Sequence, residues 1–279
     1  MNHYTMINPV LFRFYKSLTR IRPSIVGAWI KSVAHIKRRE VQTPLGVFSV
    51  DPASCFGLML IEKGVYEPEM VRVLQTCLKE GAVFFDVGAN EGYHSVIASK
   101  IVGPKGRVFA IEPQSRLQPA LQKNLELNRC ANVTLIKSAI SDQEGQAVLF
   151  LLPDINNGAS GLIRGTKYAV PTETIDTVTL EKLFTTYSID VCDLMKMDIE
   201  GFEPEAIFGS ASLFEARRIR ALALEPSAGL ARQRGHEPEQ IAAFFKQCGY
   251  KPDPTFDNTF YRQMWTCVTG DGKSREKMA

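Results

Sequence analysis

The sequence predicts an α/β protein whose parallel β-sheet is covered by helices on both faces. Two observations lead to this fold class. Short, continuously apolar segments recur along the chain, and segments with apolar residues at helical spacing separate them. A strand that is apolar throughout is buried on both faces, and regular alternation of strand and helix places parallel strands side by side.

The predicted elements follow from this periodicity and from Gly and Pro residues that end segments. We expect Ser115 to be the N-cap of the second helix after the first buried strand. The predicted strands are 47–50, 83–87, 108–111, 133–136, 147–152, 174–179, 191–197, 220–224 and 261–268. The predicted helices are 67–79, 93–101, 115–127, 204–213 and 238–247.

The middle of the chain interrupts the alternation. Residues 153–165 are rich in Asn and Gly and are expected to form a loop. The surrounding region is either a small antiparallel insertion or a loop over the functional site. Residues 153–172, together with the N-terminal residues 1–40, are the candidates for determining the choice of substrate.

Residues 1–40 differ from the rest and are interpreted as a basic appendage to a domain spanning 41–279. They contain eight Lys and Arg residues, several large apolar residues, and no acidic residue before Glu40. We expect a helical segment that packs on the main domain. The alternatives are disorder and a basic amphipathic surface helix that contacts an anionic membrane or a protein partner.

Composition excludes some classes of protein. A formal charge of +3 gives no reason to expect nucleic-acid binding. Six cysteines without a C-x-x-C pair indicate reduced thiols, so we expect a cytoplasmic protein. The sequence contains no apolar stretch of the roughly 20 residues that span a membrane, and no recognisable signal peptide. Oligomeric state is not predicted.

Acidic residues follow several of the predicted strands, where an open parallel sheet binds its ligands. The first group is Asp86-x-Gly88-x-Asn90-x-Gly92. It departs from the dinucleotide fingerprint G-x-G-x-x-G, because Asn90 occupies the second glycine position and Gly92 comes one residue early. An acid at the end of the strand suits an ammonium or sulfonium group better than a pyrophosphate.

Glu112 ends the next predicted strand. A carboxylate at this position can accept hydrogen bonds from both hydroxyls of a ribose. A solvated acid at a strand end is the alternative. Because Glu112 occurs together with the Asp86 group, we expect it to hold a ribose.

Several segments together resemble the FkbM family of methyltransferases. The resemblance extends over roughly residues 62–225, which we take as the cofactor-binding core, and its specificity comes from the combination of motifs. The segments are Gly64–Glu67, Phe85–Ser95, Gly106–Pro113, Asn124–Asn128, Asn157–Ser160 and Lys196–Glu203.

The resemblance implies a Rossmann-like class I methyltransferase fold, a seven-stranded, mostly parallel sheet whose last strand is antiparallel. The implied cofactor is S-adenosyl-L-methionine. Glu181 departs from the family, which usually has Asp there, and we interpret that position as structural. The implied cofactor-binding residues are Asp86, Gly88, Asn90 and Gly92 at the methionine part, Glu112 at the ribose, and Ser138 and Ala139 at the adenine.

A third acidic group, Lys196-x-Asp198-x-Glu200-Gly201-x-Glu203, follows the strand 191–197. Three carboxylates so close together need partners or a function, and a salt-bridged turn is the alternative to an active site. Removing a proton from a hydroxyl acceptor requires a base. Our candidates are Asp198 first, then His94, Glu200 and His236.

We expect an O-methyltransferase acting on a hydroxyl of a glycan or small natural product. No metal is predicted, although Asp198 and Glu225 end consecutive strands and could hold a divalent cation. Two other functions remain open. One is an NAD-dependent oxidoreductase, which the glycine spacing disfavours, and the other is a non-catalytic module that binds the cofactor or a partner.

Overall fold

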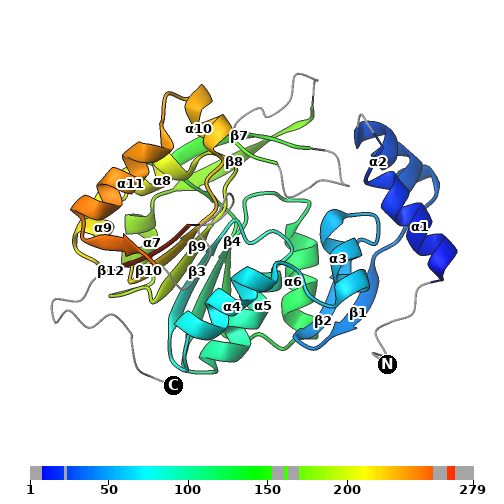
Figure 1. Cartoon of the computed structure of the whole chain (residues 1–279), viewed down its shortest axis with the longest axis horizontal. Helices are drawn as coiled ribbons and strands as arrows, with labels where there is room; N and C mark the ends of the chain where they lie inside the picture. Colours follow the sequence, from blue (N-terminus) through cyan, green and yellow to red (C-terminus); the bar gives the residue numbers. More distant parts are fainter. Residues whose placement is uncertain (1–7, 22–23, 153–159, 163–169, 254–262, 268–279) are drawn as a thin grey trace.

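A seven-stranded sheet forms the centre of the protein (Figure 1). The computed structural model describes residues 8–21, 24–152, 160–162, 170–253 and 263–267. The strand order is β11-β12-β10-β9-β3-β4-β5, and β12 runs antiparallel to both of its neighbours while the other pairs are parallel. This confirms the expected fold class. The strands are β3 (Val83–Val87), β4 (Arg107–Ile111), β5 (Val133–Ile136), β9 (Leu194–Met197), β10 (Ala221–Leu224), β11 (Tyr250–Pro252) and β12 (Gln263–Cys267).

Helices cover both faces of this sheet (Figure 1). Neighbouring strand residues point to opposite sides, so Phe84 lies in one apolar core and Phe85 in the other. The first core packs α3 (Cys55–Lys63), α4 (Pro68–Cys77), α5 (Tyr93–Val102), α6 (Gln118–Leu127) and the hairpin of β1 (Arg39–Thr43) and β2 (Gly46–Val50). The second packs α7 (Leu180–Thr186), α8 (Glu203–Phe208), α9 (Ala211–Glu215) and α11 (Pro238–Gln247), and α10 (Ala228–Gln233) follows β10.

The position of β3 defines where a ligand can bind. The chain leaves β3 towards β4 and β5 on one side, and later returns to form β9 and β10 on the other. The connections therefore diverge beyond the carboxyl ends of β3 and β9. A crevice at this topological switch point is the expected ligand site of an open α/β sheet.

A second, three-stranded sheet occupies the middle of the sequence. Its order is β6 (Ala139–Ile140), β8 (Thr172–Val178), β7 (Gly145–Phe150), with β7 and β8 antiparallel and β6 parallel to β8. The region thus contains the expected small inserted sheet, antiparallel in its β7–β8 pair. Of the predicted loop and substrate-determining segment, residues 153–159 and 163–169 lie outside the described residues.

The basic N-terminal segment forms two helices, α1 (Pro9–Leu18) and α2 (Ser24–Val33), before β1 begins at Arg39. Tyr15 and Leu18 of α1 are buried. No helix in the described part of the chain is both long and apolar enough to span a membrane.

Two predicted helix boundaries are wrong. The predicted helix 204–213 is divided into α8 and α9, because Ser210 is buried with non-helical backbone angles and its hydroxyl accepts a hydrogen bond from Leu180 N (3.3 Å). Helix α6 begins at Gln118 with Leu117 as N-cap, followed by a proline in its first turn. Ser115 instead donates its backbone N–H to Glu173.

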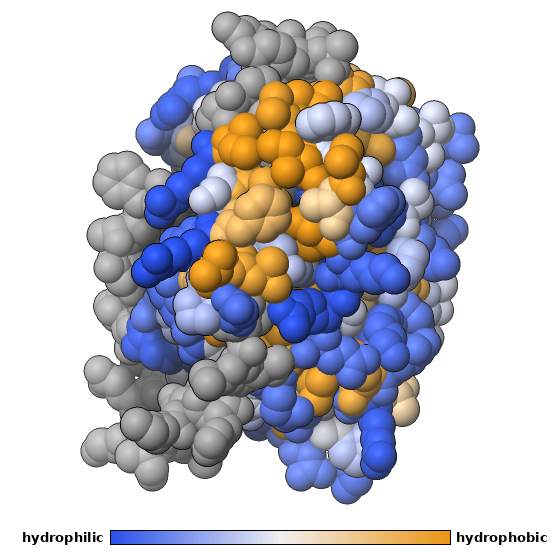
Figure 2. Space-filling model, turned by 90° about the vertical axis from the view of Figure 1, so that its right-hand side faces the viewer, coloured by the Kyte–Doolittle hydropathy of each residue, from blue (hydrophilic) through white to orange (hydrophobic). Residues whose placement is uncertain are grey.

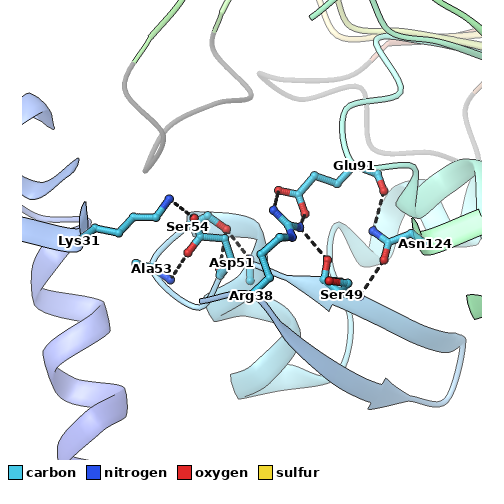
Figure 3. A network of polar contacts seen from close by, with 9 residues as sticks. Lys31, Arg38, Ser49, Asp51, Ala53, Ser54, Glu91 and Asn124 are labelled. Atoms are coloured by element: carbon cyan, nitrogen blue, oxygen red, sulfur yellow. Dashed lines mark hydrogen bonds and ion pairs between the residues drawn. The ribbon is translucent and has the colours of Figure 1, made fainter. Parts of the chain in front are cut away.

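The buried amide of Asn124 joins three separate segments (Figure 3). Its Oδ1 accepts the N–H of Ser49 in β2 (2.7 Å), and its Nδ2 donates to the carbonyl of Glu91 before α5 (2.8 Å). Beside it, Arg38 forms an ion pair with the buried Glu91 carboxylate and donates to the Ser49 carbonyl (2.7 Å). Residues preceding β1 therefore hold the loop that follows β3.

We predict that Asn124→Ala lowers the free energy of unfolding by about 2–4 kcal/mol, because two buried backbone groups lose their partner. Urea denaturation measures this loss. Gln122→Ala, at an exposed position of the same helix, is the control and should change stability by less than about 0.5 kcal/mol. Equal losses in the two variants would contradict the role given to Asn124.

Candidate cofactor and acceptor site

The loop between β3 and α5 turns through three residues with left-handed backbone angles. Gly88, Asn90 and Gly92 have φ values of 82°, 51° and 79°. A Cβ on Gly88 would lie 1.9 Å from the carbonyl oxygen of Asp198, so glycine is required by the close approach of the chain after β9. Gly92 is the N-cap of α5, and a Cβ there would contact Leu121 at 3.0 Å.

Glu112 connects this loop to the end of β4. Its Oε2 accepts the N–H of Asn90 (2.8 Å), and its Oε1 accepts the N–H of Gln114 (2.9 Å). Burial raises the pKa of Glu112 to about 7, although these two N–H groups oppose the rise. The carboxylate thus fixes the loop that follows β3.

Glu112 also lines a cavity of about 620 Å³, which we name the Glu112 cavity. One part of its wall is apolar and can hold a flat ring. That part comprises Ile111, Leu117, Ala139, Ile140, Leu149, Leu162 and Phe202. The polar part comprises Asn90, Glu112, Gln114, Ser160, Asp198 and Glu200.

A smaller cavity of about 380 Å³, the Glu67 cavity, lies against the same loop. Gly88, Asn90 and Asp198 line both cavities. The two spaces therefore adjoin at the carboxyl ends of β3 and β9. The remaining lining residues of the Glu67 cavity are Phe56, Tyr66, Glu67, Ala89, Glu91, Tyr93, His94 and Lys196.

A buried lysine lies beneath this junction. Lys196 Nζ donates to the Gly88 carbonyl (3.0 Å) and lies 3.7 Å from Asp86 Oδ1 and 3.6 Å from Asp198 Oδ2. Burial lowers the pKa of Lys196, but the surrounding carboxylates outweigh this and raise it overall. The ammonium is therefore charged and holds the ends of β3 and β9 together.

Asp86 is part of this support and lines neither cavity. Its side chain is fully buried and accepts a hydrogen bond from Ser95 Oγ (2.6 Å). Burial raises the pKa of Asp86, and Lys196 and Ser95 oppose the rise. The structure thus places Asp86 behind the loop, where it positions Lys196.

The acidic residues that follow β9 have two different environments. Asp198 and Glu200 line the Glu112 cavity. Glu203 is buried and accepts the N–H groups of Ile199 (3.2 Å) and Gly201 (3.1 Å), so it fixes the shape of the turn. Burial and then the negative charge of Asp198, Glu203 and Glu225 raise the pKa of Glu200 to about 8.

His94 lines the Glu67 cavity from the first turn of α5. Its Nε2 lies 3.5 Å from Glu67 Oε2, and the side chain is buried. Tyr66 and Tyr93 pack edge to face at 5.9 Å beside it, and Tyr93 Oη accepts the N–H of Tyr66 (3.2 Å). The cavity therefore combines an aromatic wall with a carboxylate–imidazole pair.

The structure brings together most of the predicted site residues. Gly88, Asn90, Glu112, Ala139, Asp198 and Glu200 line one cavity, and His94 lines the other. Asp86, Gly92 and Ser138 line neither of these two cavities. His236 lies in a separate hollow, 3.3 Å from Glu205.

Sequence reasoning gave no role to Lys196 or Glu67. A lysine inside an otherwise apolar strand was the available signal for Lys196. Glu67 belongs to a segment that resembles the family, but nothing local indicated that it would meet His94. Within the described residues, no group of three or more His, Cys, Asp or Glu side chains is arranged to hold a metal ion.

The sheet order and the cavity at its switch point define a class I methyltransferase architecture. Residues 86–252 match the family described as "Methyltransferase FkbM domain", which is more than half of the chain. The chain therefore belongs to the FkbM methyltransferase family, whose cofactor is S-adenosylmethionine. The residues present suit this cofactor, because one cavity is lined by a carboxylate that can accept hydrogen bonds from ribose hydroxyls and by apolar side chains that can pack against an adenine.

Individual relatives match over shorter stretches. The chain is 27% identical over 153 residues to the hexuronic acid methyltransferase AglP of Haloferax volcanii, which is 54% of this chain and 59% of that protein. It is 35% identical over 71 residues to a protein-L-isoaspartate O-methyltransferase of Methanothrix thermoacetophila, or 25% and 34% of the two chains. The chain thus spans between a third and three fifths of the length of these curated relatives.

Solved structures show a more distant likeness. A SAM-dependent methyltransferase from Aquifex aeolicus is 19% identical with a TM-score of 0.41, covering 75% of this chain and 91% of that one. A SAM-dependent O-methyltransferase from Thermotoga maritima is 13% identical with a TM-score of 0.42, covering 84% and 86%. Similarity at this level adds nothing to the assignment, which rests on the family match and the strand order.

We predict that Glu112→Ala weakens binding of S-adenosylhomocysteine at least about tenfold, because the carboxyl group that accepts hydrogen bonds from the ribose hydroxyls is lost. Isothermal titration calorimetry measures the effect, and the thermal midpoint of the variant checks its folding. Glu126→Ala, at an exposed site on α6, should bind like the wild type. An unchanged affinity in Glu112→Ala would exclude the ribose role.

Glu200 provides a test of the electrostatics. The pKa of Glu200 in the folded protein is about 8, which is above the ordinary value of 4.5. Deprotonation of Glu200 is therefore less favourable in the folded than in the unfolded chain, so the free energy of unfolding falls as the pH rises from about 4.5 through 8. Glutamine does not ionise, so the Glu200→Gln variant lacks this fall in the free energy of unfolding. When the pH is raised from about 5 to about 9, the free energy of unfolding of the variant should increase relative to that of the wild type by on the order of 1–3 kcal/mol.

Urea denaturation at both pH values measures this gain. The exposed Glu239, replaced by Gln, is the control and should follow the wild type at both. A Glu200→Gln difference that does not change with pH would contradict the raised pKa.

Proposed function

We propose that this protein transfers the methyl group of S-adenosylmethionine to a hydroxyl oxygen of a polar acceptor, such as a sugar unit of a glycan or natural product. In this proposal the Glu112 cavity holds the nucleoside part of the cofactor. The Glu67 cavity receives the acceptor. The observation that carries the proposal is that Asp198 lines both cavities, beside the Gly88–Gly92 loop.

When bound, S-adenosylmethionine would supply a methyl carbon activated by its sulfonium. The acceptor oxygen would supply the electron pair of the new bond to this carbon, and the pair of the broken carbon–sulfur bond would stay on sulfur. The protein then has two tasks, to align the acceptor and to remove its proton. We assign the second task to Asp198, because its side chain is partly exposed where the cavities meet. Lys196, 3.6 Å from Asp198 Oδ2, orients the carboxylate.

His94 is the alternative base. Glu67 lies 3.5 Å from its Nε2 and can stabilise an imidazolium that has accepted a proton. Glu200 has a pKa of about 8 and is therefore mostly protonated at neutral pH. In that state Glu200 would donate a hydrogen bond, so we assign it a binding role and place Asp198 and His94 ahead of it as bases.

Two observations favour a polar acceptor. The Glu67 cavity contains Glu67, His94, Lys196 and Asp198, which can hydrogen-bond to several hydroxyls. The relative AglP is described as a hexuronic acid methyltransferase. Other relatives include C-methyltransferases of cobalt-precorrin, so the acceptor atom is part of the proposal.

A nicotinamide-dependent oxidoreductase fits the site less well. Asn90 occupies the position of the second glycine in the dinucleotide fingerprint, and Asp198 and Glu200 line the cavity where a pyrophosphate would need positive surroundings.

We predict that Asp198→Asn lowers kcat by about 10²–10⁴, because the amide cannot accept the hydroxyl proton, while the affinity for S-adenosylhomocysteine stays within about threefold. The assay follows methyl transfer from labelled S-adenosylmethionine to hexuronic acid glycosides and to extracted glycans. Asp190→Asn, at an exposed position outside both cavities, is the matched control and should keep full activity. Full turnover in Asp198→Asn would exclude this residue as the base.

A further inference from the structure

The two N-terminal helices carry most of the exposed apolar surface. Of the eight large apolar side chains that are exposed among the described residues, seven belong to α1 and α2. We name these seven the α1–α2 patch. Figure 2 shows apolar surface gathered on this side of the molecule and bordered by hydrophilic surface. The seven residues are Val10, Leu11, Phe14, Ile25, Val26, Trp29 and Val33.

The orientation of α2 explains why its apolar face points outward. Ile25, Trp29 and Val33 recur every fourth residue and lie on one face of the helix. Lys31 lies on the opposite face and forms an ion pair with the buried Asp51 of the main domain (Figure 3). This ion pair fixes the helix so that Trp29 remains 65% exposed.

The patch lies in a segment with only positive charge. No Asp or Glu precedes Glu40, and eight Lys and Arg residues do. Lys16, Lys31 and Arg38 form ion pairs with acids of the main domain. Arg13 of α1, Arg20 shortly after α1 and Lys37 after α2 are exposed, so they add positive charge to the surface of the segment that carries the patch.

Charge and composition together select one occupant. Apolar side chains bordered by Lys and Arg are the pattern of helices that lie in the headgroup region of anionic membranes. Tryptophan is enriched at that depth, because its ring is apolar and its N–H is polar. A second copy of the chain would bring two positively charged borders together, which disfavours a symmetric dimer through this face.

We propose that the α1–α2 patch binds the surface of an anionic phospholipid membrane, with the apolar side chains in the headgroup region and Arg13, Arg20 and Lys37 facing the lipid phosphates. Arg38, in the segment after α2, forms an ion pair with Glu91, which lines the Glu67 cavity. The membrane-binding segment is therefore attached directly to the wall of the proposed acceptor site.

The test is co-sedimentation of the full chain with sucrose-loaded vesicles. One set contains phosphatidylcholine alone, and the other contains equal parts of phosphatidylcholine and phosphatidylglycerol. We expect binding to the anionic set, at least about tenfold weaker binding to the neutral set, and weaker binding as salt is raised. No binding to the anionic vesicles, or equal binding to both sets, would overturn the proposal.

Two variants separate the apolar and the electrostatic contributions. Ile25→Ser combined with Trp29→Ser should reduce binding to anionic vesicles at least about tenfold, and Arg13→Gln combined with Arg20→Gln should reduce it severalfold. Val148→Ser is the control, because Val148 is 48% exposed on β7, outside the patch. Binding of S-adenosylhomocysteine and the thermal midpoint verify that all variants fold.

Either of two results would overturn the proposal in favour of another occupant. One is that the variant with Ile25→Ser and Trp29→Ser binds anionic vesicles as strongly as the Val148→Ser control does. The other is a concentration-dependent dimer in light scattering that the Trp29 substitution abolishes, with no vesicle binding by the wild type. Neither result bears on methyl transfer, so failure here is distinguishable from failure of the proposed function.

Discussion

The buried ion pairs of Lys196 are the interaction on which the site depends. Parallel strands β3 and β9 end side by side with a carboxylate on each, and the ammonium lies within 3.7 Å of both Asp86 and Asp198. Two carboxylates at this spacing would repel each other if no cation lay between them. By also binding the Gly88 carbonyl, Lys196 holds the loop after β3 against the end of β9. Gly88 and Asn90 of this loop line both cavities, so Lys196 supports a wall that the two cavities share.

Much of the fold could be predicted because apolar periodicity reports burial directly. Strands 83–87 and 133–136 and helix 238–247 have the predicted bounds, since each is a continuous apolar or amphipathic segment with clear limits. Glu112 and Asp198 were also found from the sequence. In a parallel sheet, residues that follow the strands meet at one edge, so their position along the chain was enough.

The remaining features depend on contacts between distant segments. Gly88 suggested close approach of a ligand, but the nearest atom to a Cβ there is the Asp198 carbonyl oxygen. The motif predicts Asp86 as a cofactor ligand, and the structure adds that its buried side chain contacts Ser95 of α5 and Lys196 of β9. The break at Ser210 depends on the buried hydrogen bond from Leu180. Most of these partners are distant along the chain, so the local sequence does not predict them.

In the proposed function, the Glu112 cavity is the binding site of the sulfonium cofactor. Calorimetric titration of the wild-type chain with S-adenosylhomocysteine and, separately, with NAD tests it most directly. The account predicts saturable binding of S-adenosylhomocysteine at one site per chain and no detectable heat with NAD. Tight binding of NAD with no response to S-adenosylhomocysteine would contradict it.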